Sequence, residues 1–79
     1  MNPRVIDVKP KSDYTLEILF TNSERKIFDV KPYLDRGIFK ELKNTEVFRS
    51  VKVEDGSVSW VGGQDFCPDT LYLDGKLIN

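Results

Sequence analysis

The side chains that could do chemistry gather in residues 60–72. Asp65, Cys67 and Asp69 alternate there with bulky residues, and Pro68 is placed to open a helical turn. Two aspartates four residues apart could hold a metal or act as an acid–base pair, but a hard cation needs more oxygen ligands than this. We expect no metal site here. We interpret the two carboxylates as acceptors for backbone N–H groups in a loop and in a first helical turn.

Enzymatic chemistry finds little support in the rest of the sequence. The chain has no histidine, so the commonest general base and every imidazole triad are missing. Cys67 has no base or cation cluster near it in sequence, and we expect an inert, partly buried thiol. We predict no catalytic residues, no cofactor and no enzyme. A small hydrolase that uses Asp29, Asp35 or Asp65 is a further possibility, but the only sequence feature in its favour is the presence of these carboxylates.

Composition narrows the class of protein. The 79 residues suffice for one domain, and the absence of alanine beside many Val, Ile and Thr favours a sheet-rich fold. The net charge of −1 argues against a strongly basic nucleic-acid binder. The single cysteine is typical of a reducing compartment. No apolar stretch of the kind found in a signal peptide follows Met1. No apolar stretch is long enough to span a membrane. We therefore expect a cytoplasmic protein that does not enter membranes.

Most of the chain follows a strand pattern. Tyr14, Leu16, Ile18 and Phe20 recur at every second position, with the polar residues Thr15, Glu17 and Thr21 among them. Asp55–Gly56 is a hairpin signal of the type I′ kind. The predicted antiparallel strands are residues 4–9, 14–20, 25–30, 47–54 and 57–61.

One helix is predicted, over residues 37–43. Leu34, Ile38 and Leu42 recur at helical spacing with Phe39 beside them, and we expect these residues to cover one face of the sheet. A loop or a one-turn helix capped by Thr45 should follow. The predicted fold class is α+β: a small antiparallel sheet, made of a three-stranded meander plus a hairpin, is covered on one face by a short helix. Residues 1–72 form the domain, and residues 73–79 form a tail that is either a short strand or frayed.

Many spaced positions agree in order with a known family. The sequence resembles the small bacterial and phage proteins grouped as domain of unknown function 2442. The positions that carry the resemblance are Pro3-Arg4-Val5, Leu16, Phe20, Phe28-Asp29-Val30-x-Pro32-Tyr33-Leu34-Asp35-x-Gly37-x-Phe39-x-x-Leu42, Phe48, Val51, Val53, Val58-x-Trp60, Gly63-x-Asp65 and Cys67-Pro68-x-Thr70-Leu71-Tyr72. Ser23 departs from the pattern, because the family often has glycine there, although a type I turn can still form.

The resemblance implies a small antiparallel sheet with short helices and transfers no catalytic residue. It also implies a neighbouring gene for another small protein, an arrangement similar to toxin–antitoxin pairs. We therefore predict a non-enzymatic module, the antitoxin-like half of a two-gene pair, that binds the protein encoded by that adjacent gene. Loops with conformationally special residues often carry function, which points to the segments around Tyr33–Gly37 and residues 60–72. The predicted protein-binding residues are Tyr33, Asp35, Trp60 and Asp65.

A nucleic-acid-associated regulator is the alternative function. It would use basic residues spread over the first part of the chain, whereas residues 53–79 contain several acids and only one base, Lys76. The acidic pI near 5.3 and the lack of an evident recognition helix count against it. The candidate nucleic-acid contacts are Arg4, Arg25, Lys26, Lys31 and Arg49.

Overall fold

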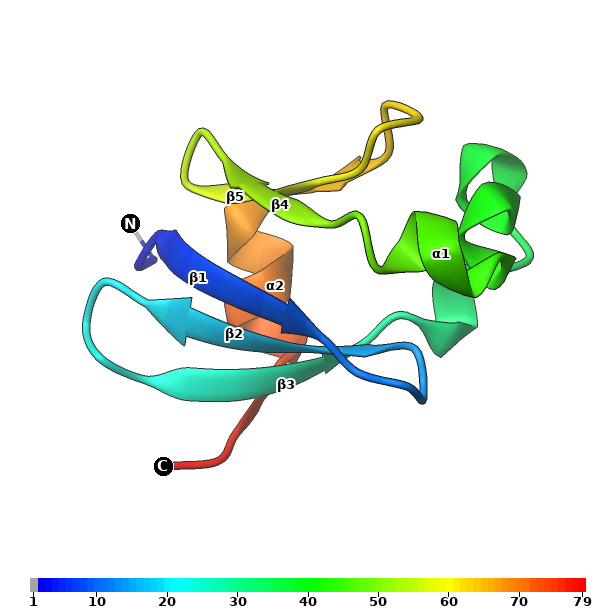
Figure 1. Cartoon of the computed structure of the whole chain (residues 1–79). Coiled ribbons are helices and arrows are strands. Elements are labelled where there is room, and N and C mark those ends of the chain that lie inside the picture. Colours follow the sequence, from blue (N-terminus) through cyan, green and yellow to red (C-terminus); the bar gives the residue numbers. More distant parts are fainter. Residues whose placement is uncertain (1) are drawn as a thin grey trace.

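The computed structural model describes residues 2–79. Its strands are β1 (Val5–Pro10), β2 (Thr15–Phe20), β3 (Arg25–Asp29), β4 (Lys52–Glu54), β5 (Ser57–Ser59), β6 (Asp65–Phe66) and β7 (Lys76–Leu77). Its helices are the 3₁₀ helices η1 (Lys31–Tyr33) and η2 (Gly37–Lys43) and the α-helices α1 (Thr45–Phe48) and α2 (Pro68–Asp74). Figure 1 shows two small sheets lying one over the other, with η1, η2 and α1 gathered at one end. The α+β class is confirmed.

The first sheet is the predicted meander with one more strand at its edge. Its order is β1-β2-β3-β7, and its neighbouring strands are antiparallel. The inward-facing side chains Leu16, Ile18 and Phe20 are all 0% exposed, so the alternation read from the sequence is confirmed. Strand β7 comes from residues 73–79, which therefore contain a short strand rather than only a frayed end.

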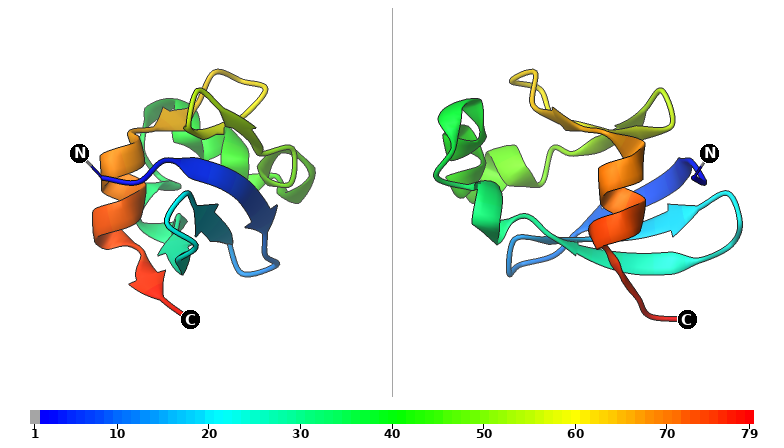
Figure 2. Two further views of the ribbon diagram at one scale, coloured as in Figure 1. Left: turned by 90° about the vertical axis from the view of Figure 1, so that its left-hand side faces the viewer. Right: turned by 180° about the vertical axis from the view of Figure 1, so that it is seen from behind.

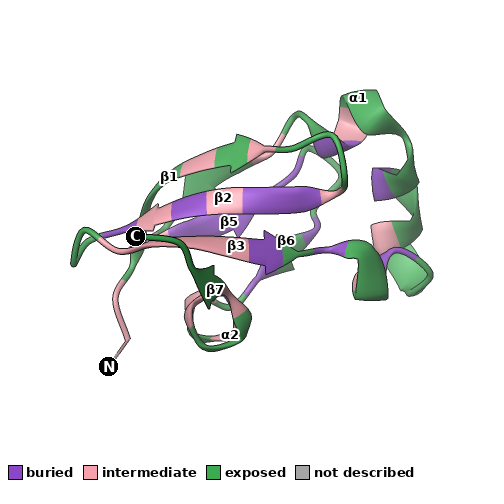
Figure 3. Cartoon of the chain, turned by 90° about the horizontal axis from the view of Figure 1, so that it is seen from below, coloured by how far each residue is buried: buried purple, intermediate pink, exposed green. Residues whose placement is uncertain are grey.

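The predicted hairpin forms a second sheet of its own, in the order β4-β5-β6. Asp55 and Gly56 have φ of 53° and 77°, as the two central residues of a type I′ turn require. Strand β6 was not predicted, because two residues are too short for a recognisable alternation. Figure 3 shows the buried strand β5 behind the buried strand β2, with the core between the two sheets.

Helix η2 occupies the predicted range with a different winding. In a 3₁₀ helix residues three apart share a face, so Phe39 and Leu42 turn inward together while Ile38 and Glu41 turn outward. Leu34 and Leu42 are buried as expected, and Phe39 is half-buried. The prediction was wrong for Ile38, which is 57% exposed, because it assumed the 3.6-residue period of an α-helix.

The strand predicted over residues 47–54 was wrong in its first half. Helix α1 is found there, and its cap is Asn44 rather than Thr45. The Asn44 side chain accepts hydrogen bonds from the N–H groups of Glu46 (2.9 Å) and Val47 (3.4 Å). This cap starts a helix among β-branched residues, because it satisfies N–H groups that have no partner in the first turn.

Strand β1 is the edge strand of the first sheet, and it is irregular. Its register shifts between Val5 and Asp7, and the Asp7 carboxylate accepts a hydrogen bond of 2.9 Å from the N–H of Val8. Pro10, the last residue of the strand, has no N–H to offer. At the other end the N–H of Val5 donates to the carbonyl of Gly56 (2.9 Å), which ties β1 to the turn of the second sheet.

Replacing Ser23 with glycine should stabilise the protein. The N–H of Ser23 donates to the carbonyl of Phe20, which closes the expected turn, but Ser23 itself has φ of +70°. A residue with a Cβ is strained in this left-handed conformation, so Ser23→Gly should raise the free energy of unfolding by about 0.5–1 kcal/mol. Urea denaturation measures the change. Ser12→Gly is the control at a serine without a positive φ, and an equal gain there would contradict the explanation.

Candidate functional site

The two segments predicted to carry function lie side by side and meet in an aromatic cluster. The ring of Tyr33 lies 4.9 Å from that of Phe66 and 5.9 Å from that of Phe28, between ring centroids. The Phe39 ring lies 5.1 Å from Phe66. Because Phe66 belongs to β6, this cluster fastens the segment before η2 to the second sheet. Tyr33 is half-buried: one part of its side chain packs against the core, and the other part is exposed.

The two predicted aspartates lie on the surface. Asp35 forms an ion pair with Lys43 at 2.6 Å, and this hydrogen bond together with the charge of Lys43 lowers the pKa of the Asp35 carboxyl. Its side chain is 83% exposed, so water screens the pair. Asp65 is exposed on β6, next to the buried Phe66.

Trp60 belongs to the core. It is 2% exposed, and its indole N–H donates a hydrogen bond of 2.8 Å to the carbonyl of Phe48. A side chain enclosed in this way offers no surface to another molecule. We therefore leave Trp60 out of the binding surface proposed below.

The side chain of Gln64 joins the loop after Trp60 to helix η2. Its amide nitrogen donates to the carbonyl of Ile38 (2.7 Å) and to the carboxylate of Glu41 (2.8 Å). Gln64 is 0% exposed, and its amide oxygen has no hydrogen-bond partner among the described residues. Gly62 allows this close approach, because a Cβ there would come within 2.5 Å of the Glu41 carboxylate.

These hydrogen bonds bring two exposed apolar side chains to one end of the molecule. Ile38 is 57% exposed and Val61 is 80% exposed. Figure 2 shows their two segments, η2 and the loop before β6, at the same end of the two sheets. Glu41 supplies a charged neighbour through its bond to Gln64. We refer to Ile38 and Val61 as the Ile38–Val61 patch.

A shallow acidic pocket lies on the second sheet, and all three of its strands contribute to the lining. It encloses about 380 Å³, and its lining includes Glu54, Asp55, Asp65 and Cys67. Cys67 is exposed, so the prediction of a partly buried thiol was wrong. Neighbouring side chains point to opposite sides of an extended chain. Because Phe66 points into the core, the side chain of Cys67 beside it points outward. No three Asp, Glu, His or Cys residues within residues 2–79 are grouped to hold a metal ion.

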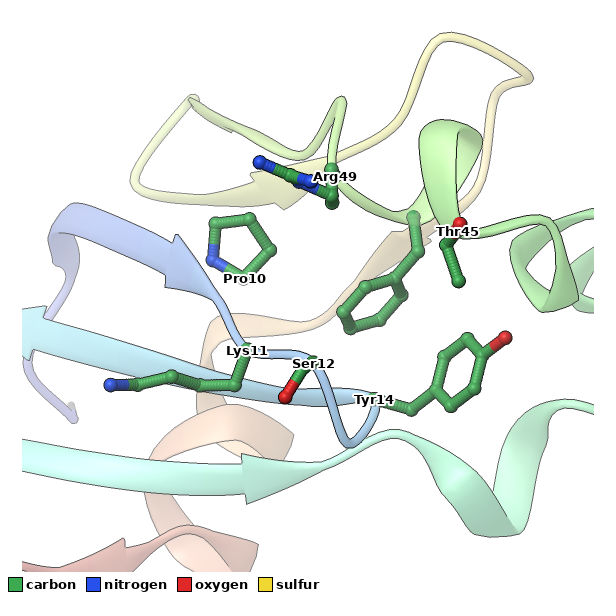
Figure 4. Close-up of a pocket in the computed structure, with 7 residues that line it drawn as sticks. Pro10, Lys11, Ser12, Tyr14, Thr45 and Arg49 are labelled. Atoms are coloured by element: carbon green, nitrogen blue, oxygen red, sulfur yellow. The ribbon is translucent and has the colours of Figure 1, made fainter.

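A second pocket lies between the β1–β2 turn and helix α1 (Figure 4). It encloses about 370 Å³. We call it the Arg49 pocket, and it is lined by Pro10, Lys11, Ser12, Tyr14, Thr45, Phe48 and Arg49.

A family model described as a protein of unknown function (DUF2442) matches residues 5–76. The chain belongs to this family. No curated protein and no solved structure matches it. The description of the DUF2442 family names no activity. No helix within residues 2–79 has the length and the apolar character needed to cross a membrane.

Several residues of interest in this DUF2442 chain were not singled out from the sequence. Gln64 follows two glycines, but nothing in that pattern indicates a fully buried amide. The strand predicted over residues 47–54 includes Phe48, and the helix predicted over residues 37–43 places Ile38 in the core. A 3₁₀ interpretation of residues 37–43 would have shown that Ile38 and Glu41 point outward together.

Proposed function

We propose that this DUF2442 chain is a protein-interaction module that binds the small protein encoded beside it, as the antitoxin-like half of the pair. The observation that carries the proposal is the Ile38–Val61 patch. Ile38 and Val61 are 57% and 80% exposed although the chain has a well-formed core elsewhere. We further propose that binding takes place in the cytoplasm and that the chain has no catalytic activity of its own.

The patch has the anatomy of a small binding surface. Its apolar side chains are bordered by polar and charged residues, as the apolar centre of an interface is bordered by a polar rim. Asp35 and Glu41 are the acidic side chains nearest in sequence, and both are exposed. The backbone beneath is fixed by Gln64, so little conformational freedom would be lost on binding. The basic side chains of Arg36 and Lys40 are exposed there as well, so a partner with an apolar side chain flanked by residues of both charges would suit this surface.

The nucleic-acid alternative has less support. Arg25 pairs with Glu17 at 3.4 Å, and Lys31 pairs with Asp29 at 3.1 Å. Lys26 lies 3.6 Å from the centre of the Tyr72 ring. These three basic groups would have to give up their contacts to bind phosphates, which leaves only Arg4 and Arg49 of the candidates outside any ion pair or cation–π contact within residues 2–79. The carboxylate-based hydrolase is weaker still, since the Asp29 and Asp35 carboxylates are each paired with a lysine.

Co-expression with the product of the adjacent gene tests the proposal. Ile38→Ser and Val61→Ser should each weaken the complex about tenfold or more, as loss of a central apolar contact does. Isothermal titration calorimetry on the purified pair gives the affinities. Leu73→Ser is the matched control, because Leu73 is 68% exposed but lies on α2. Circular dichroism checks that each variant keeps its fold.

Two results would count against the proposal. A stable complex that is unaffected by Ile38→Ser and Val61→Ser would remove the patch from the interface. No complex at all, together with binding to DNA or RNA that weakens steeply with salt, would favour the nucleic-acid alternative.

A further inference from the structure

We propose that the Arg49 pocket binds a small molecule that joins a ring-sized apolar body to one carboxylate group. This inference goes beyond protein binding, because none of the residues of the Ile38–Val61 patch lines the pocket. It rests on the shape and lining of the cavity, on an unused cation at its rim and on the rigidity of its wall.

The cavity is suited to an apolar ring. Its volume of about 370 Å³ lies within the range of sites that enclose small ligands. Tyr14 and Pro10 are half-buried and supply the accessible apolar surface. Phe48, which is 2% exposed, supports this surface from the core, and Tyr14 packs edge-on against it with 5.2 Å between ring centroids. Aromatic walls of this kind favour a flat apolar group.

The charge of the lining selects an anion. Lys11 and Arg49 are its only ionisable cations, and no Asp or Glu is among the lining residues. The Lys11 ammonium is already paired with Glu17 at 3.1 Å. Arg49 is exposed and takes part in no ion pair within residues 2–79. A guanidinium presents a planar fork that matches both oxygens of a carboxylate.

Two hydroxyls complete the polar part of the pocket. Figure 4 shows Arg49 extending toward Pro10, with Ser12 and Tyr14 on the opposite side and Thr45 at one end of the pocket, above Tyr14. The side chains of Ser12 and Thr45 donate no hydrogen bond to another described residue. A hydroxyl without a partner in the protein can donate a hydrogen bond to a bound ligand.

The wall of the pocket is held in place before any ligand arrives. Tyr14 has φ of +62°, which is costly for a residue with a bulky side chain. Its hydroxyl donates to the carbonyl of Lys43, and its own carbonyl accepts a hydrogen bond of 3.0 Å from Val30. A strained residue fixed at both ends gives a preorganised wall, which lowers the cost of ordering on binding.

Titration of the full chain with phenylacetate, followed by amide chemical shifts in two-dimensional NMR, tests the site. We expect saturable shifts centred on Ser12, Tyr14, Thr45 and Arg49, with a Kd of about 1–10 mM for a fragment of this size. Phenylacetamide, which lacks the charge, and acetate, which lacks the ring, should each bind about tenfold more weakly.

A pair of variants separates a specific contact from general attraction. Arg49→Gln should weaken phenylacetate binding about tenfold, whereas Lys52→Gln should leave it unchanged, because Lys52 is an exposed cation outside the pocket that pairs with Glu54 at 3.8 Å. Any of four results would overturn the assignment: no saturable shifts, shifts centred on Ile38 and Val61, equal binding of phenylacetamide, or equal losses in both variants. The ligand comparison on the unaltered chain keeps the test valid if a variant folds poorly.

Discussion

Replacing Phe28 with alanine should lower the free energy of unfolding by about 3–5 kcal/mol, the usual cost of removing a buried phenyl ring. Phe28 is 1% exposed, and its ring lies 5.0 Å from that of Phe66 in the opposite sheet. The change would open a cavity where the two sheets meet. A loss of this size is comparable to the whole stability of a small domain, so the variant should be largely unfolded at moderate temperature.

Trp60 provides the measurement for Phe28→Ala. It is the only tryptophan, and at 2% exposure its fluorescence should change strongly on unfolding in urea. Ile6→Ala is the control, since Ile6 is 54% exposed and its truncation should cost little. Similar midpoints for Phe28→Ala and the unaltered protein would show that the two sheets do not pack through this ring.

The second large effect is expected at Gly75, where helix α2 ends. A Cβ at this position would lie 2.7 Å from the carbonyl oxygen of Leu71 and 3.1 Å from the Cβ of Lys26. Because the first of these atoms belongs to the backbone, the helix end would have to move away from β3. Gly75→Ala should therefore lower the free energy of unfolding by about 1–3 kcal/mol, as overpacking does.

Gly37→Ala is the matched comparison for Gly75→Ala. Gly37 has φ of +48°, and a Cβ added there would have no other atom within 4 Å, so alanine meets backbone strain but no steric conflict. Gly75 has φ of −72°, which alanine adopts without backbone strain, so Gly75→Ala tests only the steric conflict of the added Cβ. Thermal unfolding should show a fall of about 4–8 °C per kcal/mol for a domain of this size. A smaller fall for Gly75→Ala than for Gly37→Ala would contradict the steric explanation.

The sequence was informative wherever one physical signal dominated. Alternation at Leu16, Ile18 and Phe20 identified β2 and its buried face, and Asp55–Gly56 identified the second hairpin. Pro68 marked the first residue of α2 correctly. In each case a local preference agrees with the packing, so local information was sufficient.

Predictions from the sequence were wrong where local signals conflict or where tertiary contacts decide the structure. Val47 and Val51 have high strand propensity, yet the Asn44 cap and the burial of Phe48 beneath Trp60 produce helix α1. The pairing of β5 with β6 is closed by the short loop of residues 61–63, in which the N–H of Trp60 donates to the carbonyl of Gln64 at 2.9 Å and Gly63 has φ of +91°. The two glycines indicated a turn, but the two-residue strand after it was too short to recognise.

The candidate site was predicted only in part. The two segments proposed as functional do meet, through the rings of Tyr33 and Phe66. The individual residues that face outward could not be chosen, because that choice depends on the winding of η2 and on the Gln64 hydrogen bonds. The Arg49 pocket joins residues more than thirty positions apart in the chain, from the β1–β2 turn to α1, and no local pattern could indicate it.

The irregular edge of β1 bears on how the protein behaves when many copies are crowded together. An open strand edge is a template on which identical chains can stack into cross-β fibres. Here the N–H of Val8 is occupied by Asp7, Pro10 has none, and the shifted register bends the strand. Such an edge resists the addition of a further strand. The chain can thus accumulate as separate molecules without this edge becoming a seed for aggregation.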